Sequence, residues 1–204
     1  MKKSSLSPIE KVYSAFYLSK KEKIYFNELR EINKLSISSL QNALTKLEKR
    51  REILKIKEKG NVFYSLIKKE EIAIKFTKFD ILRFNELNLE IKIPLKDFLE
   101  QFPKQVKFIL LFGSASRKQE KQESDIDLLV ILQEFSDKKL QSLYEKEIKG
   151  KFETARKKVN SRSNHPLSLA FVDSKEFKIS KDHLIIQAKE TGFPIWGSFQ
   201  HYNE

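Results

Sequence analysis

The chain of 204 residues contains no cysteine and only three histidines. The absence of cysteine excludes disulfides, thiol catalysis and cysteine-ligated zinc, and it fits a reducing compartment. The histidines, His165, His183 and His201, are scattered along the chain. A metal site is therefore not expected to rest on sulfur or on histidine.

Long apolar runs are also missing. No window approaches the roughly twenty apolar residues that span a bilayer, and the opening MKKSSLSPIE has no secretory signal pattern, so we expect a cytoplasmic protein without membrane contact. Internal repeats and low-complexity tracts are absent as well. The 40% hydrophobic content with sixteen phenylalanines instead predicts packed globular structure, long enough for two small domains.

Acidic residues are scarce in the N-terminal third of the chain. Residues 1–70 hold 17 Lys and Arg against 8 Asp and Glu, whereas residues 71–204 hold 23 against 20. An uneven basic surplus is a footprint expected of nucleic-acid binding, although surface lysines that serve solubility give the same count.

The basic N-terminal region predicts three helices followed by a β-hairpin. Ser7 and Pro8 are typical of a helix start, and a Lys-Gly-Asn turn separates two alternating apolar segments. The predicted helices cover Ser7–Ser19, Tyr25–Asn33 and the segment from Ser36 or Ser38 to about Arg50. This order resembles a winged helix-turn-helix domain, with the third helix as the recognition helix and the hairpin as the wing.

The winged-helix resemblance implies binding of double-stranded DNA through the recognition helix and the wing. The alternative is a winged helix used for dimerisation or for docking a partner. The candidate DNA-binding residues are Ser36, Ser38, Ser39, Gln41, Asn42, Lys46, Lys49, Arg50, Arg51, Lys57, Lys59 and Asn61.

The rest of the chain predicts a mixed α/β domain. The predicted boundaries are a winged helix-turn-helix domain over 1–70, a helical linker over 71–105, and a second domain over 106–204 with a short mixed β-sheet flanked by helices. Its strands are expected at Gln105–Phe112, Asp125–Leu132, 166–173 and in the terminal FPIWG, and its helices at 135–159 and Lys181–Lys189.

The first two of these strands bracket a motif, KFILLFGSASRKQEKQESDIDLLVIL. Gly113 lets the backbone approach a ligand, and Ser114 begins a turn whose free N–H groups favour phosphate. Asp125 and Asp127 project from one face of the following strand because strand side chains alternate. Two carboxylates so close repel each other unless a cation lies between them, and Mg²⁺ prefers such hard oxygen ligands.

These residues resemble the nucleotidyltransferase superfamily that includes DNA polymerase beta, and the spacing is similar to its minimal nucleotidyltransferase group. The resemblance implies that Gly113 and Ser114 hold the phosphates of an NTP, that Asp125 and Asp127 bind Mg²⁺ (or Mn²⁺), and that Arg117 neutralises phosphate charge. Arg117 is equally compatible with a surface role. Lys118 stands where the family usually has glycine.

Active members of the superfamily carry a third catalytic carboxylate on a later strand. In this chain Ser168 or Ala170 occupies the expected position, and Asp173 at the strand end is the nearest substitute. Two functions therefore stay open. One is Mg²⁺-dependent transfer of a nucleoside monophosphate to a hydroxyl; the other is a DNA-binding regulator whose inactive nucleotidyltransferase-like domain binds nucleotide or a partner.

The acceptor is not readable from the residues. Minimal nucleotidyltransferases often act as antitoxins toward HEPN-type ribonuclease toxins, so the resemblance implies such a protein partner. A second copy of the chain is a further candidate partner.

Overall fold

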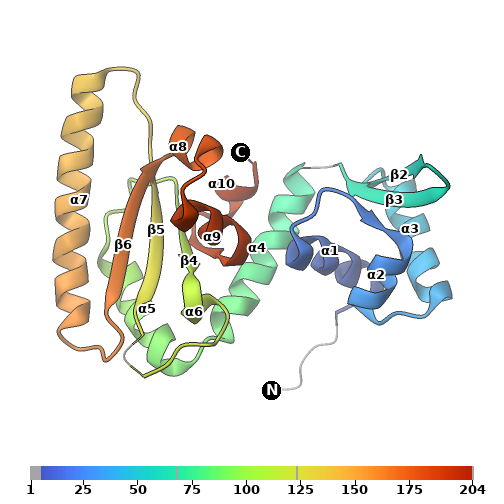
Figure 1. Cartoon of the computed structure of the whole chain (residues 1–204), viewed down its shortest axis with the longest axis horizontal. Helices are drawn as coiled ribbons and strands as arrows, with labels where there is room; N and C mark the ends of the chain where they lie inside the picture. The colour runs from blue at the N-terminus through green and yellow to red at the C-terminus, as the bar shows by residue number, and fades with distance from the viewer. Residues whose placement is uncertain (1–5, 68, 123, 204) are drawn as a thin grey trace. The chain divides into compact units, whose positions relative to one another are not determined.

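The computed structural model describes residues 6–67, 69–122 and 124–203, which form two compact units (Figure 1). Among these residues, the first unit holds those up to Phe79 with Tyr202 and Asn203, and the second holds Asp80–His201. Helix α4 (Lys69–Asn85) crosses this division. Of the segment predicted as a linker, 71–105, the part from Asp80 onward clusters with the second unit, because α5 (Leu89–Gln101) buries its apolar side there.

The first unit packs its helices on a small antiparallel sheet of order β1-β3-β2. Its elements in chain order are α1 (Pro8–Ser19), β1 (Ile24–Tyr25), α2 (Phe26–Asn33), α3 (Ile37–Lys49), β2 (Ile53–Glu58), β3 (Asn61–Leu66) and the first part of α4.

Local sequence signals set the ends of these elements. Ser7 caps α1 in a capping box with Glu10, and Ser36 caps α3 by accepting the N–H of Ser39 at 3.2 Å. Lys59 and Gly60 both have positive φ, 47° and 82°, as a two-residue hairpin turn requires. The predicted helix starts and the hairpin are confirmed.

The core of the first unit joins α1, α3 and the sheet. Its largest fully buried side chains come from all of these elements and include Tyr13, Ile24, Leu40, Leu44 and Leu47. Leu40, Leu44 and Leu47 share one side of α3, so the opposite side of this helix is left to solvent.

The second unit is built on a four-stranded sheet of order β6-β5-β4-β7. Strand β5 is parallel to β6 and antiparallel to β4, which is antiparallel to β7, so the sheet is mixed as the sequence predicted. Its elements after α5 are β4 (Phe108–Phe112), α6 (Gly113–Ser116), β5 (Ile126–Leu132), α7 (Lys138–Asn160), β6 (Leu167–Asp173), α8 (Ser174–Ile179), α9 (His183–Thr191), β7 (Phe193–Trp196) and α10 (Ser198–Asn203).

Both faces of this sheet are covered. Alternate residues of β5, such as Leu128 and Val130, pack with α5 and α7, while Leu129 and Ile131 pack with α8 and α9. Burial on both faces explains why β4 and β5 read as continuous apolar runs. At the start of β5 the second face instead carries Asp127, which leaves a polar patch at one end of the sheet.

Most of the regular elements predicted from the sequence are present, with shifts of a few residues at their ends. The predicted strand from Gln105 begins at Phe108, and the predicted helix from Lys181 begins at His183 after the cap Asp182. In the described part of the chain, no helix is long and apolar enough to cross a membrane.

Candidate functional site

The Gly-Ser turn and the Asp-x-Asp segment meet at one end of the β4–β5 pair. Phe112 pairs with Asp127 across the two strands, so Gly113 lies beside the start of β5. Gly113 has a φ of 70°, and a Cβ on it would lie 2.3 Å from Oδ2 of Asp127. The carboxylate of Asp127 therefore occupies the space that any side chain at position 113 would need.

The two carboxylates place two negative charges at the start of β5. Asp125 is exposed just before β5, Asp127 is half-buried within it, and the Ile126 between them is fully buried. Burial, and after it the negative charge of Asp125, raise the pKa of the Asp127 carboxyl. A cation bound between the two groups would offset this penalty.

Hydrogen bonds from neighbouring elements hold the Gly-Ser turn in place. The buried Ser116 hydroxyl donates to the carbonyl of Gly113 at 2.9 Å and to that of Thr191 at 3.2 Å. Arg83 donates to the carbonyl of Ser116 at 3.1 Å while its guanidinium lies 4.1 Å from the ring centre of Phe193. These contacts tie α6 to α4 and to the end of α9.

A second set of contacts holds the backbone on each side of Asp125. The buried His165 ring bonds through Nδ1 to the carbonyl of Ser124 at 2.8 Å, and the Ile126 N–H donates to the carbonyl of Pro166 at 2.8 Å. Because a carbonyl only accepts, Nδ1 carries the proton in this bond. His165 is therefore a positioning residue for the segment that carries Asp125.

The phosphate-binding candidates lie around a single helical turn. Ser114 is partly exposed, and its carbonyl accepts the N–H groups of Arg117 and Gln119. Arg117 is exposed, and its Nε donates to the Gln119 side chain at 3.0 Å. Lys118, at the position where the family usually has glycine, has a left-handed backbone with a φ of 56°.

No carboxylate stands beside Asp127 on β6. The parallel register pairs Asp127 with Ser168 and Leu129 with Ala170, so Ser168 is the neighbour on the same face. Asp173 pairs with Leu132, about 16 Å farther along the strand. It caps α8 by accepting the N–H of Glu176 at 2.6 Å, so the structure does not bring it to the Asp125–Asp127 pair.

The donor set fits a hard divalent cation. It offers the carboxylate oxygens of two aspartates, one of them packed against a glycine, and Mg²⁺ prefers such hard oxygen ligands. A cluster of three or more acidic, histidine or cysteine side chains suited to a metal does not occur among the described residues. Two protein ligands with substrate phosphates are, however, a usual arrangement for Mg²⁺.

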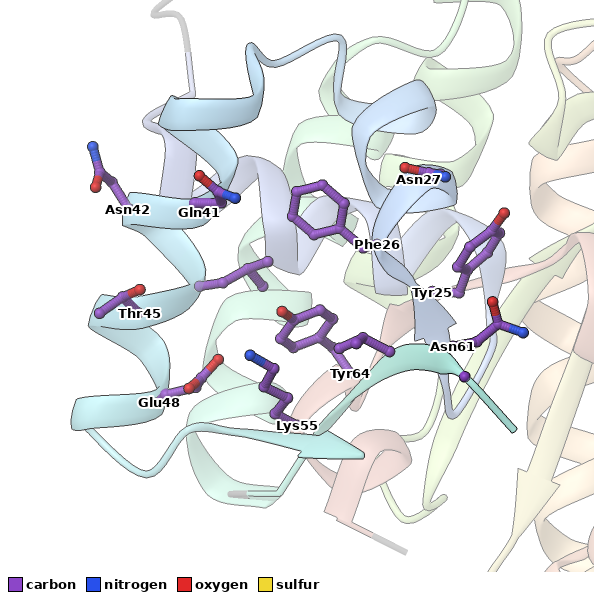
Figure 2. Close-up of a pocket in the computed structure, with 13 residues that line it drawn as sticks. Tyr25, Phe26, Asn27, Gln41, Asn42, Thr45, Glu48, Lys55, Asn61 and Tyr64 are labelled. Atoms are coloured by element: carbon purple, nitrogen blue, oxygen red, sulfur yellow. The ribbon is translucent and has the colours of Figure 1, made fainter. Parts of the chain in front are cut away.

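A separate candidate site lies in the first unit, along the solvent side of α3. Its exposed polar residues recur at helical spacing and are Ser38, Gln41, Asn42, Thr45, Lys46 and Lys49. Between this helix and β2–β3 lies a groove of about 710 Å³ (Figure 2). Phe26 and Tyr64 line it together with the polar side chains of Gln41, Thr45 and Lys55.

The predicted DNA-binding residues divide into three groups. Gln41, Asn42 and Asn61 line the groove, and Lys57 shares a face of β2 with Lys55. Ser39 and Lys46, again with Asn42, line a smaller hollow against the start of α1. Ser36 caps α3 and contacts Ser38, Lys59 lies at the hairpin tip, and Lys49, Arg50 and Arg51 are exposed where α3 ends.

Comparison with known proteins bears on the second unit. The family model described as polymerase beta, nucleotidyltransferase matches residues 94–189, which run from within α5 into α9 and contain the Gly-Ser and Asp-x-Asp segments. No curated protein matches the chain. The match supports the nucleotidyltransferase superfamily for this segment, and at that level it suggests transfer of a nucleoside monophosphate.

Several residues of both sites were missed from the sequence. Thr45 and Glu48 follow Gln41 at spacings of four and seven, a helical signal that was available. His165, Arg83 and Ser116 reach the Asp-x-Asp segment or the Gly-Ser turn only through the fold, because they come from other parts of the chain.

Proposed function

We propose that the second unit transfers a nucleoside monophosphate from an NTP to a hydroxyl acceptor. The acceptor oxygen forms a bond to the α-phosphorus, the bond from this phosphorus to the bridging oxygen breaks, pyrophosphate leaves, and the acceptor proton passes to solvent. The observation that carries this proposal is the carboxylate of Asp127 packed against Gly113, with Asp125 beside it.

The residues of the chain have distinct roles in this proposal. Asp125 and Asp127 hold Mg²⁺ (or Mn²⁺), Gly113 and Ser114 hold the phosphates, and Arg117 contacts the triphosphate from the rim. A cation held by these two aspartates would supply positive charge that offsets the negative charge of the triphosphate during transfer. The acceptor, expected from the resemblance to be a HEPN-type protein partner, stays a prediction.

The test is calorimetric titration of ATP, GTP, CTP and UTP with and without Mg²⁺. We expect one or more of them to bind in a Mg²⁺-dependent manner, and Asp127→Asn to abolish this binding. Asp97→Asn, an exposed position on α5, is the matched control and should bind like the wild type. If no nucleotide binds the wild type, the proposed site is not a nucleotide site.

Ser168 favours a second candidate function, a nucleotide-binding or partner-binding domain without turnover. It stands beside Asp127 in the register, on the strand where active relatives carry their third carboxylate. Ser168→Asp tests this: if only this group is missing, transfer of a radiolabelled α-phosphate to an acceptor should appear in the variant. Activity already present in the wild type would rule out the second candidate.

We also propose that the first unit is a winged helix that binds double-stranded DNA. The proposal is supported by the order of three helices followed by a hairpin, by the β1-β3-β2 sheet and by the polar outer side of α3. Residues 1–70 contain 17 basic and 8 acidic residues, and this positive surplus favours binding of the unit to DNA phosphates.

Fluorescence anisotropy with duplex DNA over a range of salt concentrations tests DNA binding. Replacing Lys49, Arg50 and Arg51 with alanine should weaken binding and flatten its dependence on salt, because fewer counterions are released. The control variant has Lys138, Lys139 and Lys146 of α7 replaced with alanine. It loses the same amount of positive charge, but from an exposed surface of the second unit. Equal losses in both variants would contradict the assigned face.

A further inference from the structure

The groove of the first unit carries one acidic side chain, Glu48, among neutral and basic ones (Figure 2). Glu48 projects from α3, and Lys55 of β2 lies across the groove from it. Gln41 and Thr45 precede Glu48 on the same side of the helix, and Asn61 lies at the rim formed by β3. The groove thus combines amide, hydroxyl and carboxylate groups above an aromatic floor.

Glu48 has no evident structural role. It lies in the last turn of α3, where a carboxylate meets the negative end of the helix dipole. Within the described part of the chain its carboxylate forms no hydrogen bond and no ion pair, in contrast to Glu10, Glu52 and Glu58 of the same unit. A carboxylate that does not stabilise its helix or a neighbour is available to a ligand.

The surroundings of Glu48 determine what kind of ligand group it suits. A phosphate is repelled by the carboxylate, so the end of the groove beside Glu48 suits the DNA backbone less well than it suits a base edge. An amino group on a base edge is the matching partner, because a carboxylate only accepts hydrogen bonds. In the major groove, cytosine presents such a group at N4, and Glu and Asp side chains accept from it.

We infer that this groove reads base edges in the major groove of double-stranded DNA and that Glu48 selects a base presenting an amino group, cytosine above all. Gln41 and Asn61 offer amides, which donate and accept hydrogen bonds at neighbouring bases. Burial, and after it the Glu48 charge, raise the pKa of the Tyr64 hydroxyl at the floor of the groove. The inference rests on the DNA binding proposed above.

The experiment is selection of preferred duplexes from a randomised pool by the full chain and by Glu48→Gln. The wild type should enrich sequences with cytosine at one position, and the variant should lose that preference because its amide also donates. Against a duplex lacking this cytosine, the variant should bind a few-fold more tightly than the wild type, since one repulsive charge is gone. Against the selected duplex it should lose roughly tenfold or more.

Glu31→Gln is the matched control, because Glu31 is an exposed acidic residue of α2 outside the groove. It removes the same charge and should keep the wild-type preference. Identical enriched sequences for the wild type and Glu48→Gln would overturn the inference while leaving DNA binding intact. A wild type that binds no duplex would overturn both, and circular dichroism spectra establish that each variant is folded.

Discussion

The two candidate sites differ in how the chain holds them. Asp125, Asp127 and Gly113 are fixed by strand register and by buried groups such as His165 and Ser116. The groove of the first unit is instead lined mainly by exposed side chains of α3 and the hairpin. Substitutions should therefore change function and stability together in the second unit, and function alone in the first.

The largest effect is expected from Gly113→Ala. The new Cβ would meet Oδ2 of Asp127 at 2.3 Å, and the φ of 70° is left-handed, so unfolding should become easier by about 1–3 kcal/mol. Binding of Mg²⁺ and nucleotide should be lost. Thermal denaturation and calorimetry measure the two effects.

Gly150→Ala provides the control for this change. Gly150 lies within α7, and apart from the backbone of its own helix turn no described atom lies within 4 Å of an added Cβ, so alanine should stabilise the helix by about 0.5–1 kcal/mol. If both glycine substitutions had the same effect, the close approach of Asp127 would not matter.

His165→Leu should have the next largest effect. The change leaves the partly buried Ser124 carbonyl without its partner, which should cost about 1–3 kcal/mol of unfolding free energy. Mg²⁺ affinity should fall as well, because the backbone beside Asp125 is released. His165→Asn, which keeps a donor, should recover part of the affinity.

The exposed His183 supplies a control that separates this contact from the loss of any histidine. His183→Leu should leave both stability and Mg²⁺ affinity close to wild type. If His165→Leu retained full Mg²⁺ affinity despite lower stability, a positioning role would be contradicted.

Asp127→Asn should stabilise the metal-free protein while abolishing its response to Mg²⁺. The folded-state pKa of Asp127 is raised above its unfolded value, so the charged carboxylate weakens the fold at neutral pH. The variant should gain about 1 kcal/mol or less there. The gain should shrink as the pH falls through the folded pKa toward about 3.9, the usual value for an aspartate.

Thermal denaturation between pH 4 and 8 measures this difference, with added Mg²⁺ as the second variable. The wild type should be stabilised by the ion and the variant should not. A variant that was less stable than the metal-free wild type at pH 7 would show that the carboxylate is held by favourable contacts instead.

The smallest effect on stability is expected from Gln41→Ala combined with Thr45→Ala. Both side chains are exposed on α3, and alanine is a better helix former than threonine, so stability should stay within about 0.5 kcal/mol. Duplex DNA affinity should nevertheless fall. If this double variant lost stability as well as DNA affinity, the two sites would not differ in the way described above.

Sequence reasoning succeeded where the signal is local. The Ser7 and Ser36 caps, the hairpin turn at Lys59-Gly60 and the apolar strands β4 and β5 all rest on neighbouring residues. The short elements β1, α8 and α10 were missed, since two to six residues carry too little pattern.

For the candidate sites, too, the sequence predicted what depends on neighbouring residues and missed what depends on the fold. The Gly-Ser and Asp-x-Asp segments are close in sequence and were identified from it, and the matched family model covers them. The choice between Ser168 and Ala170 required the β5–β6 register, since strand pairing over a long separation is not encoded in nearby residues. The groove required the packing of α3 against β2–β3, so Glu48 and Lys55 were not singled out.

The pairing of β4 with β5 has a consequence for the order of folding. The chain between Phe112 and Asp127 is far shorter than the chain between Asp127 and Ser168, so closing the first loop costs less entropy. Both aspartates and the glycine beside them belong to this early-closing hairpin. During synthesis, the β4–β5 pair with its two aspartates is therefore expected to be able to form before β6 has left the ribosome.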